Sequence, residues 1–201
     1  MISSGIVRSK ERKPGSACAT GTGSLAAASA PAILNGKYVK TKGHCTLKNS
    51  AGTGYPVVYE VLEGKAHFLL QKKTWTISCS LEATTGDIVL LPPGYGHVTI
   101  NPSAEDTLTM ANLVSTAFTS DYAFYEKMHG AAFSELTGGI FHKNLAYPAV
   151  PPLGKMKNMH SLHNNFGIGN TLSDFMGIDR IAHLLNHPEN YRYFLSGQFN
   201  A

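Results

Sequence analysis

The stretch GDIVLLPPGYGHVTIN, residues 86–101, decides how the chain is expected to fold. Gly86 permits a turn into an apolar strand, and the run that begins at Pro92 forces a tight turn after it. The next strand then delivers His97 to the inner side of a sheet, with Asn101 at its far end. An imidazole that points into a barrel is a candidate metal ligand. We therefore expect a β-barrel with His97 inside it.

The residues around this stretch extend the β pattern in both directions. Residues 37–114 contain short runs of Val, Ile, Thr, Tyr and Leu, which Gly, Pro, Asn and Asp interrupt. No long helical period separates the runs, so an antiparallel sandwich or barrel is predicted. Apolar residues then recur at near-helical spacing beyond the Pro-rich segment 147–155, which predicts one or two helices on the outside of the barrel. These residues are Phe175, Ile178, Ile181, Ala182 and Leu185.

Composition excludes several classes of protein. The 201 residues fit one domain, with 43% hydrophobic and 15% charged residues, and no apolar run approaches the ~20 residues of a membrane span. The net charge of +4 is spread out, and no basic stripe alternates with aromatic residues, so we expect no nucleic-acid partner. Cys18, Cys45 and Cys79 form an odd set without a CxxC spacing, which favours a reducing cytoplasm over a disulfide framework or a zinc knuckle.

The first 32 residues have two interpretations. They begin with a short basic run and continue with Ser, Ala and Gly. A frayed tail followed by a small-residue edge strand is one interpretation, and a transit peptide is the other. We expect three parts: a tail and edge segment at 1–32, a barrel at 33–151, and a Pro-rich connection with a helical tail at 152–201.

The spacing of the glycines, proline and histidine in 86–101 resembles the second sequence motif of the cupin superfamily. The words NGKYVKTKGH, YPVVYEVLEGKAHFLLQ, MANLVS and SDY make the resemblance narrower, because together they are similar to the cupin-type glucose-6-phosphate isomerase family of archaea and some bacteria. This resemblance covers roughly 33–151. It implies an all-β jelly-roll barrel, the double-stranded β-helix, which here carries a C-terminal helical extension.

The resemblance also implies where a metal ion would bind. The first cupin motif has a His-x-His pair and then a Glu six residues ahead of a Gly. Here His44 begins the pair, Thr46 stands where its second His belongs, and Val57 occupies the Glu position before Gly64. His44 and His97 are thus the two remaining ligands of four. We expect a divalent ion (Fe, Mn, Ni or Zn) to be weakly held or absent.

The family's sugar-phosphate site carries over onto Thr41, Gly43 and His44 of the KTKGH segment and onto the inward-facing Tyr59 of the next strand. The resemblance implies interconversion of glucose 6-phosphate and fructose 6-phosphate, a step of glycolysis and gluconeogenesis, by a cytoplasmic homodimer. Aldose–ketose isomerisation needs a group that moves a proton between adjacent carbons, and Val57 at the family's base position cannot do so.

Two alternatives therefore remain open. One is a cupin that binds sugar phosphate without turnover. The other is a metal-independent isomerase that uses Tyr59 or Glu60 as base. Strand alternation turns Glu60 away from the side of Val57, so it needs a register shift in 57–63. The other histidines considered, His67, His160 and His163, are expected at the surface or hydrogen-bonded rather than as metal ligands.

Overall fold

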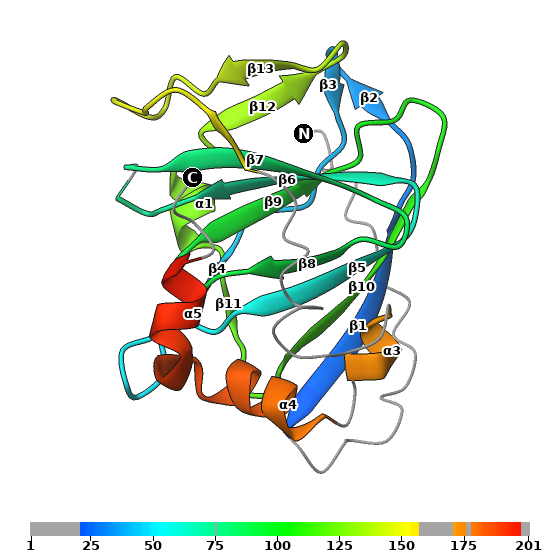
Figure 1. Ribbon diagram of the computed structural model, residues 1–201. Coiled ribbons are helices and arrows are strands. Elements are labelled where there is room, and N and C mark those ends of the chain that lie inside the picture. The colour runs from blue at the N-terminus through cyan, green and yellow to red at the C-terminus, as the bar shows by residue number, and fades with distance from the viewer. Residues whose placement is uncertain (1–20, 75, 157–170, 176–177, 198–201) are drawn as a thin grey trace.

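The computed structural model describes residues 21–74, 76–156, 171–175 and 178–197. Two four-stranded sheets face each other and build the barrel (Figure 1). Cys18, the basic N-terminal run, His160 and His163 lie outside the described residues, and so do the expectations attached to them.

The first sheet has the order β1 (Thr22–Ser29), β10 (Leu108–Ser115), β5 (Val57–Glu63) and β8 (Ile88–Leu91). The second has the order β14 (Gly154–Met156), β7 (Ser78–Thr84), β6 (Lys65–Gln71) and β9 (Gly96–Ile100). Neighbouring strands are antiparallel except β14 and β7, which are parallel. The antiparallel jelly-roll barrel predicted from the sequence is confirmed.

Alternate residues of both sheets fill the barrel. Val57 and Val61 of β5 meet Phe68 and Leu70 of β6 in one apolar cluster, and each is at most 1% exposed. Full burial of a side chain of this size stabilises the fold by ~1.5–3 kcal/mol. The two-residue period of these strands thus decides which residues reach the inner wall.

A second layer covers the outside of the β6–β9 sheet. A small sheet has the order β13 (Ile140–Lys143), β12 (Phe133–Leu136), β3 (Lys37–Tyr38) and β2 (Ile33–Leu34). The short strands β4 (Cys45–Thr46) and β11 (Ser120–Asp121) pair beside it, and helix α1 (Ala123–Lys127) follows β11. Tyr125 of α1 and Phe133 of β12 pack against Leu69 and Val98 of the barrel.

The C-terminal helices cover the outer face of the other sheet, as Figure 1 shows. They are α3 (Leu172–Phe175), α4 (Asp179–Asn186), the 3₁₀ turn η1 (Pro188–Tyr191) and α5 (Arg192–Gly197). Ile181, Leu184 and Leu185 of α4 are fully buried against Val58 and Leu113. The predicted helical extension on the outside of the barrel is confirmed.

The small-residue segment forms an edge strand. All eight residues of β1 pair with β10, from Thr22 opposite Ser115 to Ser29 opposite Leu108. At the other end of the barrel region, β14 adds a strand to the second sheet from within the segment after the prolines. None of the described helices is both long enough and apolar enough to cross a membrane.

Candidate functional site

Three side chains meet on the inner wall of the barrel, and we call them the histidine cluster: His44, His97 and Tyr59. Gly94, at φ 81°, lets the chain turn into β9, whose His97 pairs with Leu70 of β6. His44 bridges to His97 on the other side through two backbone hydrogen bonds of 3.2 and 2.9 Å. The two imidazole rings therefore lie edge to face, with their centroids 4.3 Å apart.

Tyr59 completes the cluster from the facing sheet. Its hydroxyl lies 3.0 Å from Nε2 of His97, and its ring packs on the barrel core. Asn112 lies directly opposite Tyr59 on β10, and a hydrogen bond from its side chain to Tyr59 favours the ionised phenol. The hydroxyl of Tyr59 is thus engaged by His97 and by Asn112.

The cluster is electrically neutral. Burial lowers the pKa of His97 well below its usual 6.5, and the neighbouring His44 lowers it further. Burial also lowers the pKa of His44, against a hydrogen bond to the Lys42 backbone that raises it. The pKa of Tyr59 is raised, mainly by burial. At neutral pH the cluster therefore holds two uncharged imidazoles and an uncharged phenol.

A cation and an aromatic ring lead from solvent to the cluster. Lys42 Nζ lies over the Tyr122 ring, 4.8 Å from its centroid, and the Tyr122 ring centroid is 5.6 Å from that of His44. Lys42 is also paired with Glu126 of α1 at 2.5 Å, where both side chains are 57% exposed. Exposure falls from this pair through Tyr122, at 39%, to His97, at 2%.

The residues present do not fit the family's four-ligand metal site. Val57 is 1% exposed in the apolar core and offers no donor atom. The Thr46 hydroxyl, close to Gly54, has no hydrogen-bond partner among the described residues. Tyr59 already engages Nε2 of His97, and no group of three His, Cys, Asp or Glu side chains in the described part of the chain could hold an ion. His44 and His97 remain a two-ligand site at most.

Two residues expected to bind sugar phosphate also hold the fold. The hydroxyl of Thr41 accepts a 2.9 Å hydrogen bond from the backbone of Thr99. A Cβ on Gly43 would lie 2.2 Å from the Tyr125 ring, so this glycine makes room for helix α1. Thr41 is exposed and its hydroxyl keeps its own proton to donate, whereas the buried Gly43 offers a ligand only backbone.

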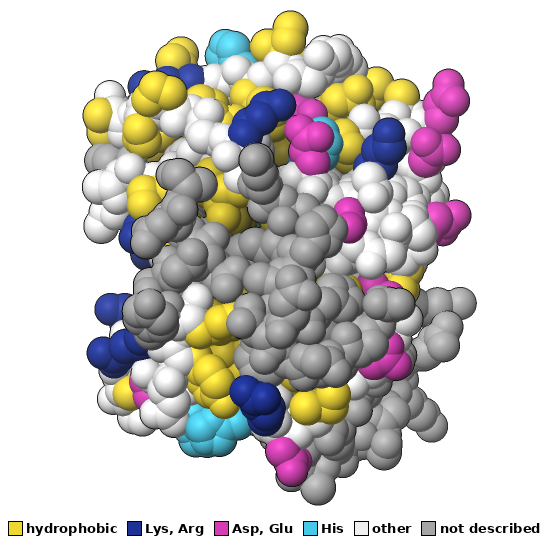
Figure 2. All heavy atoms as spheres, in the orientation of Figure 1, with side chains coloured by type: hydrophobic (Ala, Val, Ile, Leu, Met, Phe, Trp, Pro, Cys, Tyr) yellow, Lys and Arg dark blue, Asp and Glu magenta, His cyan; other side chains and the backbone are white. Residues whose placement is uncertain are grey.

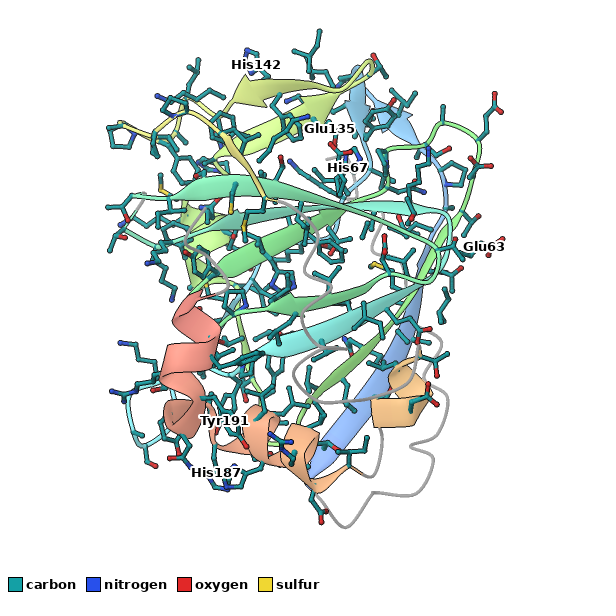
Figure 3. The ribbon with its side chains drawn as sticks, in the orientation of Figure 1. Glu63, His67, Glu135, His142, His187 and Tyr191 are labelled. Carbon is teal, nitrogen blue, oxygen red and sulfur yellow. The ribbon has the colours of Figure 1, made fainter. Side chains whose placement is uncertain are left out.

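Glu60 and His67 lie away from the cluster. Residues 57–60 pair with β8 in regular register, and Glu60 accepts a 2.8 Å hydrogen bond from the backbone of Leu172 in α3. It therefore faces the outer side, as strand alternation predicted, and cannot act as the base. His67 is hydrogen-bonded to Glu135 at 2.8 and 2.9 Å, and Figure 3 shows the pair side by side. The expectation of a hydrogen-bonded His67 is confirmed.

A separate cavity of about 230 Å³ opens at the edge of β7 and β14. Cys79, Tyr95 and Lys155 are among its lining residues, but no member of the histidine cluster is. Cys79 and Cys45 are both free thiols. This cavity is therefore separate from the candidate site formed by the histidine cluster.

Sequence reasoning missed Lys42, Tyr122 and Glu126. Lys42 stands inside KTKGH and Tyr122 ends SDY, so both were within matched words but received no role. Glu126 comes from a helix four residues later, and only the fold brings it to Lys42. The signal available was a lysine two residues before His44, which places a cation beside the candidate site.

Comparison with solved structures shows weak similarities to plant and bacterial proteins. Vicilin from Corylus avellana is 15% identical with a TM-score of 0.40, over 51% of this chain and 26% of that one. A variant of Bacillus subtilis oxalate decarboxylase is 14% identical with a TM-score of 0.40, over 51% and 24%. An oxalate oxidase is 12% identical with a TM-score of 0.42, over 55% and 50%. The chain thus spans about a quarter to a half of the lengths of these three proteins.

No curated protein sequence matches the chain. The sequence model of one family does match, over residues 27–149, which is more than half of the chain. Its description reads glucose-6-phosphate isomerase. The matched region contains the whole histidine cluster together with Lys42 and Tyr122, and the chain belongs to the glucose-6-phosphate isomerase family of cupin barrels.

Proposed function

We propose that the protein recognises the hexose 6-phosphates of its family, glucose 6-phosphate and fructose 6-phosphate, at the histidine cluster. The observation that carries the proposal is a row of neighbouring side chains: the Lys42 ammonium lies over the Tyr122 ring, and this ring lies beside His44. An exposed ammonium suits a phosphate, and an aromatic ring followed by polar groups suits a sugar. The Lys42–Glu126 pair is exposed on both sides and contributes little, so Lys42 exchanges Glu126 for a phosphate at small cost.

The proposed reaction is the family's interconversion of the two sugar phosphates. It moves a hydrogen between C1 and C2 and a proton between the oxygens on these carbons. If the substrate separates the Tyr59 hydroxyl from Nε2 of His97, that nitrogen of the neutral imidazole can accept a proton and the released hydroxyl can donate one to a sugar oxygen. A base whose pKa lies well below 6.5 is a weak proton acceptor, so this route is slow.

Binding without turnover is the second candidate, and Val57 favours it. A positioned general base accelerates a reaction by ~10²–10⁴-fold, and Val57 removes the family's base. Val57 is 1% exposed within an apolar cluster, and its side chain offers no group that could move a proton. Recognition of phosphate and sugar does not need that base, so affinity survives the change while turnover does not.

A paired measurement tests both candidates. Calorimetric titration with fructose 6-phosphate, with fructose as a control, measures recognition of the phosphate. A coupled isomerase assay with and without added Mn²⁺ or Fe²⁺ measures turnover. We expect binding of fructose 6-phosphate, none of fructose, and low or no turnover. Absence of binding would contradict the proposal, and turnover near that of active isomerases would contradict the binding-only candidate.

Lys42 offers the sharpest variant. Lys42→Met keeps an apolar side chain of similar length but removes the charge, and we expect binding to weaken by about 10- to 150-fold, since a hydrogen bond to a charged group contributes about 1.5–3 kcal/mol. Lys65→Met is the matched control, because Lys65 starts β6 at the end away from Leu70, the partner of His97. Equal losses in both variants would exclude a specific role for Lys42.

We further propose that the protein works in the cytoplasm, in glycolysis or gluconeogenesis, as a homodimer. The unpaired state of Cys45 and Cys79 supports a reducing compartment. Fe, Mn, Ni or Zn is proposed as a weakly held ion at most, because only His44 and His97 of the four ligand positions carry imidazoles, and the Thr46 hydroxyl is a poor neutral ligand.

A further inference from the structure

A second pair of histidines lies on the C-terminal helices, far along the chain from the barrel cluster. His183 belongs to α4, and His187 caps its C-terminal end. The backbone N–H of His187 donates to the carbonyl of His183 at 2.8 Å, so one closed helical turn separates them. Residues four apart on a helix share a face, and their side chains are neighbours. Two histidines in this arrangement can chelate one ion.

The separation of the two rings fits a shared ion. Their centroids are 4.9 Å apart with an interplanar angle of 40°. A metal–nitrogen bond of about 2.0–2.1 Å puts each ring centroid about 3.2 Å from the ion. Two rings at a tetrahedral or a right angle around the ion are then about 5.2 or about 4.5 Å apart. The observed separation falls between these values.

Each imidazole is already oriented through its other nitrogen. Nδ1 of His183 lies 3.1 Å from the Tyr191 hydroxyl, and Nδ1 of His187 faces the Glu189 carboxylate at 3.5 Å. Metal-binding histidines characteristically engage the second ring nitrogen in this way, which leaves Nε2 for the ion. Glu189 is fixed in turn by a 2.7 Å hydrogen bond from Asn49. Figure 3 labels His187 and Tyr191 close together at this end of the molecule.

The surroundings favour a cation that keeps solvent ligands. His183 is exposed, and the His187 side chain is 55% exposed. Figure 2 shows histidine side chains gathered at the surface in this region. The negative end of the α4 dipole and the nearby Glu189 both attract positive charge. No third His, Cys, Asp or Glu ligand completes the group among the described residues, so an ion bound here would take its remaining ligands from solvent.

We propose that His183 and His187 form a two-histidine binding site for a borderline divalent transition metal ion, of the class of Cu²⁺, Ni²⁺ and Zn²⁺. Imidazole suits these ions, and Cu²⁺ binds most tightly in the general order of stability. The ion fastens the end of α4 to η1 and, through Glu189 and Asn49, to the loop that follows β4. This site is independent of the proposed sugar-phosphate site.

The test uses the full chain without a histidine tag. Zn²⁺ and Cu²⁺ titrations of the parent count the binding equivalents, and electron paramagnetic resonance of the Cu²⁺ form counts the coordinating nitrogens. We expect His183→Gln and His187→Gln each to remove one equivalent or weaken it by more than about 10-fold, because even loss of an orienting partner costs about 10–100-fold. The control is His142→Gln, at an exposed residue of β13, which should leave the titration unchanged.

Tyr191→Phe separates binding from folding. It removes only the hydroxyl beside His183 and should weaken Zn²⁺ binding while the circular dichroism spectrum stays that of the parent. Hydrogen exchange of the parent is the second measurement, and added Zn²⁺ should slow exchange in residues 183–190. The proposal is overturned if either histidine variant keeps every equivalent, if only one nitrogen is seen on Cu²⁺, or if Zn²⁺ leaves exchange in 183–190 unchanged.

Discussion

Gly43→Ala tests whether the glycine before His44 serves packing rather than phosphate binding. The added Cβ would lie 2.2, 2.5 and 2.6 Å from three atoms of the Tyr125 ring. The ring cannot move away, because its other edge lies 2.7–2.8 Å from where a Cβ on Gly96 would be, beside the Cys45 thiol. Tyr125 is thus held between two glycines, and the new methyl group must displace the backbone of β9 or α1.

The expected loss of stability follows from this geometry. Overpacking a well-packed core costs ~1–3 kcal/mol and occasionally more. Three contacts below 3 Å, against a ring that is confined on both sides, put Gly43→Ala at about 3 kcal/mol or above. For a domain of this size that corresponds to a decrease in Tm of about 6–12 °C.

Urea unfolding followed by circular dichroism measures the change, and Gly23→Ala is the matched control. A Cβ on Gly23 of β1 would meet nothing nearer than 4.0 Å, so its effect should stay within about 0.5 kcal/mol. The double variant Gly43→Ala with Tyr125→Ala should be less destabilised than the sum of its parts, since the clash is gone. A loss below about 1 kcal/mol for Gly43→Ala would refute the packing role.

Three further changes address the histidine cluster. Tyr59→Phe should lower the free energy of unfolding by about 1–3 kcal/mol, because Nε2 of His97 loses its hydrogen-bond partner. The same change should raise the affinity for Mn²⁺, and unchanged affinity in calorimetry would show that Tyr59 does not block the ion. Val57→Glu should destabilise the metal-free protein by several kcal/mol, because it buries an unpaired carboxylate. Added Mn²⁺ should restore part of this lost stability in urea unfolding, and no effect of Mn²⁺ would contradict the assignment of position 57 as a ligand position. The pKa of His97 is lower in the folded protein than its unfolded value of 6.5, so the stability that the neutral ring contributes is present above pH 6.5 and is lost as the pH falls below it, by up to about 1.4 kcal/mol per pH unit. His97→Gln should flatten this slope in urea unfolding. An identical slope in parent and variant would contradict the lowered pKa of His97.

The barrel was predictable because its signals are local. Gly86 and Gly94 both adopt positive φ, and the alternation of apolar residues in β5 and β6 directly sets the inner wall. The C-terminal helices followed from their apolar spacing in the same way. The number and ends of these helices were not predictable, because each described helix is only four to eight residues long and the breaks between them, such as the one at Pro188, depend on how the segment packs on the barrel.

The site was only partly predictable because its contacts join distant segments. The sequence names His44, Tyr59 and His97, but the hydrogen bond from Tyr59 to Nε2 of His97 depends on how two sheets face each other. Lys42 pairs with Glu126 across 84 residues. The packing role of Gly43 could not be predicted from its motif either, because the Tyr125 ring that packs against it belongs to α1.

The changes at the metal site are mutually consistent with a barrel that folds without an ion. A Glu at position 57 would place a carboxylate in the apolar core, where an unpaired charge is costly, and Val57 avoids that cost. Removing the ion would leave Nε2 of buried His97 without a partner, and the Tyr59 hydroxyl satisfies it. Lowered imidazole pKa values keep the paired rings neutral, so they do not repel each other. What this arrangement retains is a neutral polar cluster beside the exposed Lys42, and this is why we propose that the site holds a sugar phosphate more readily than it transforms one.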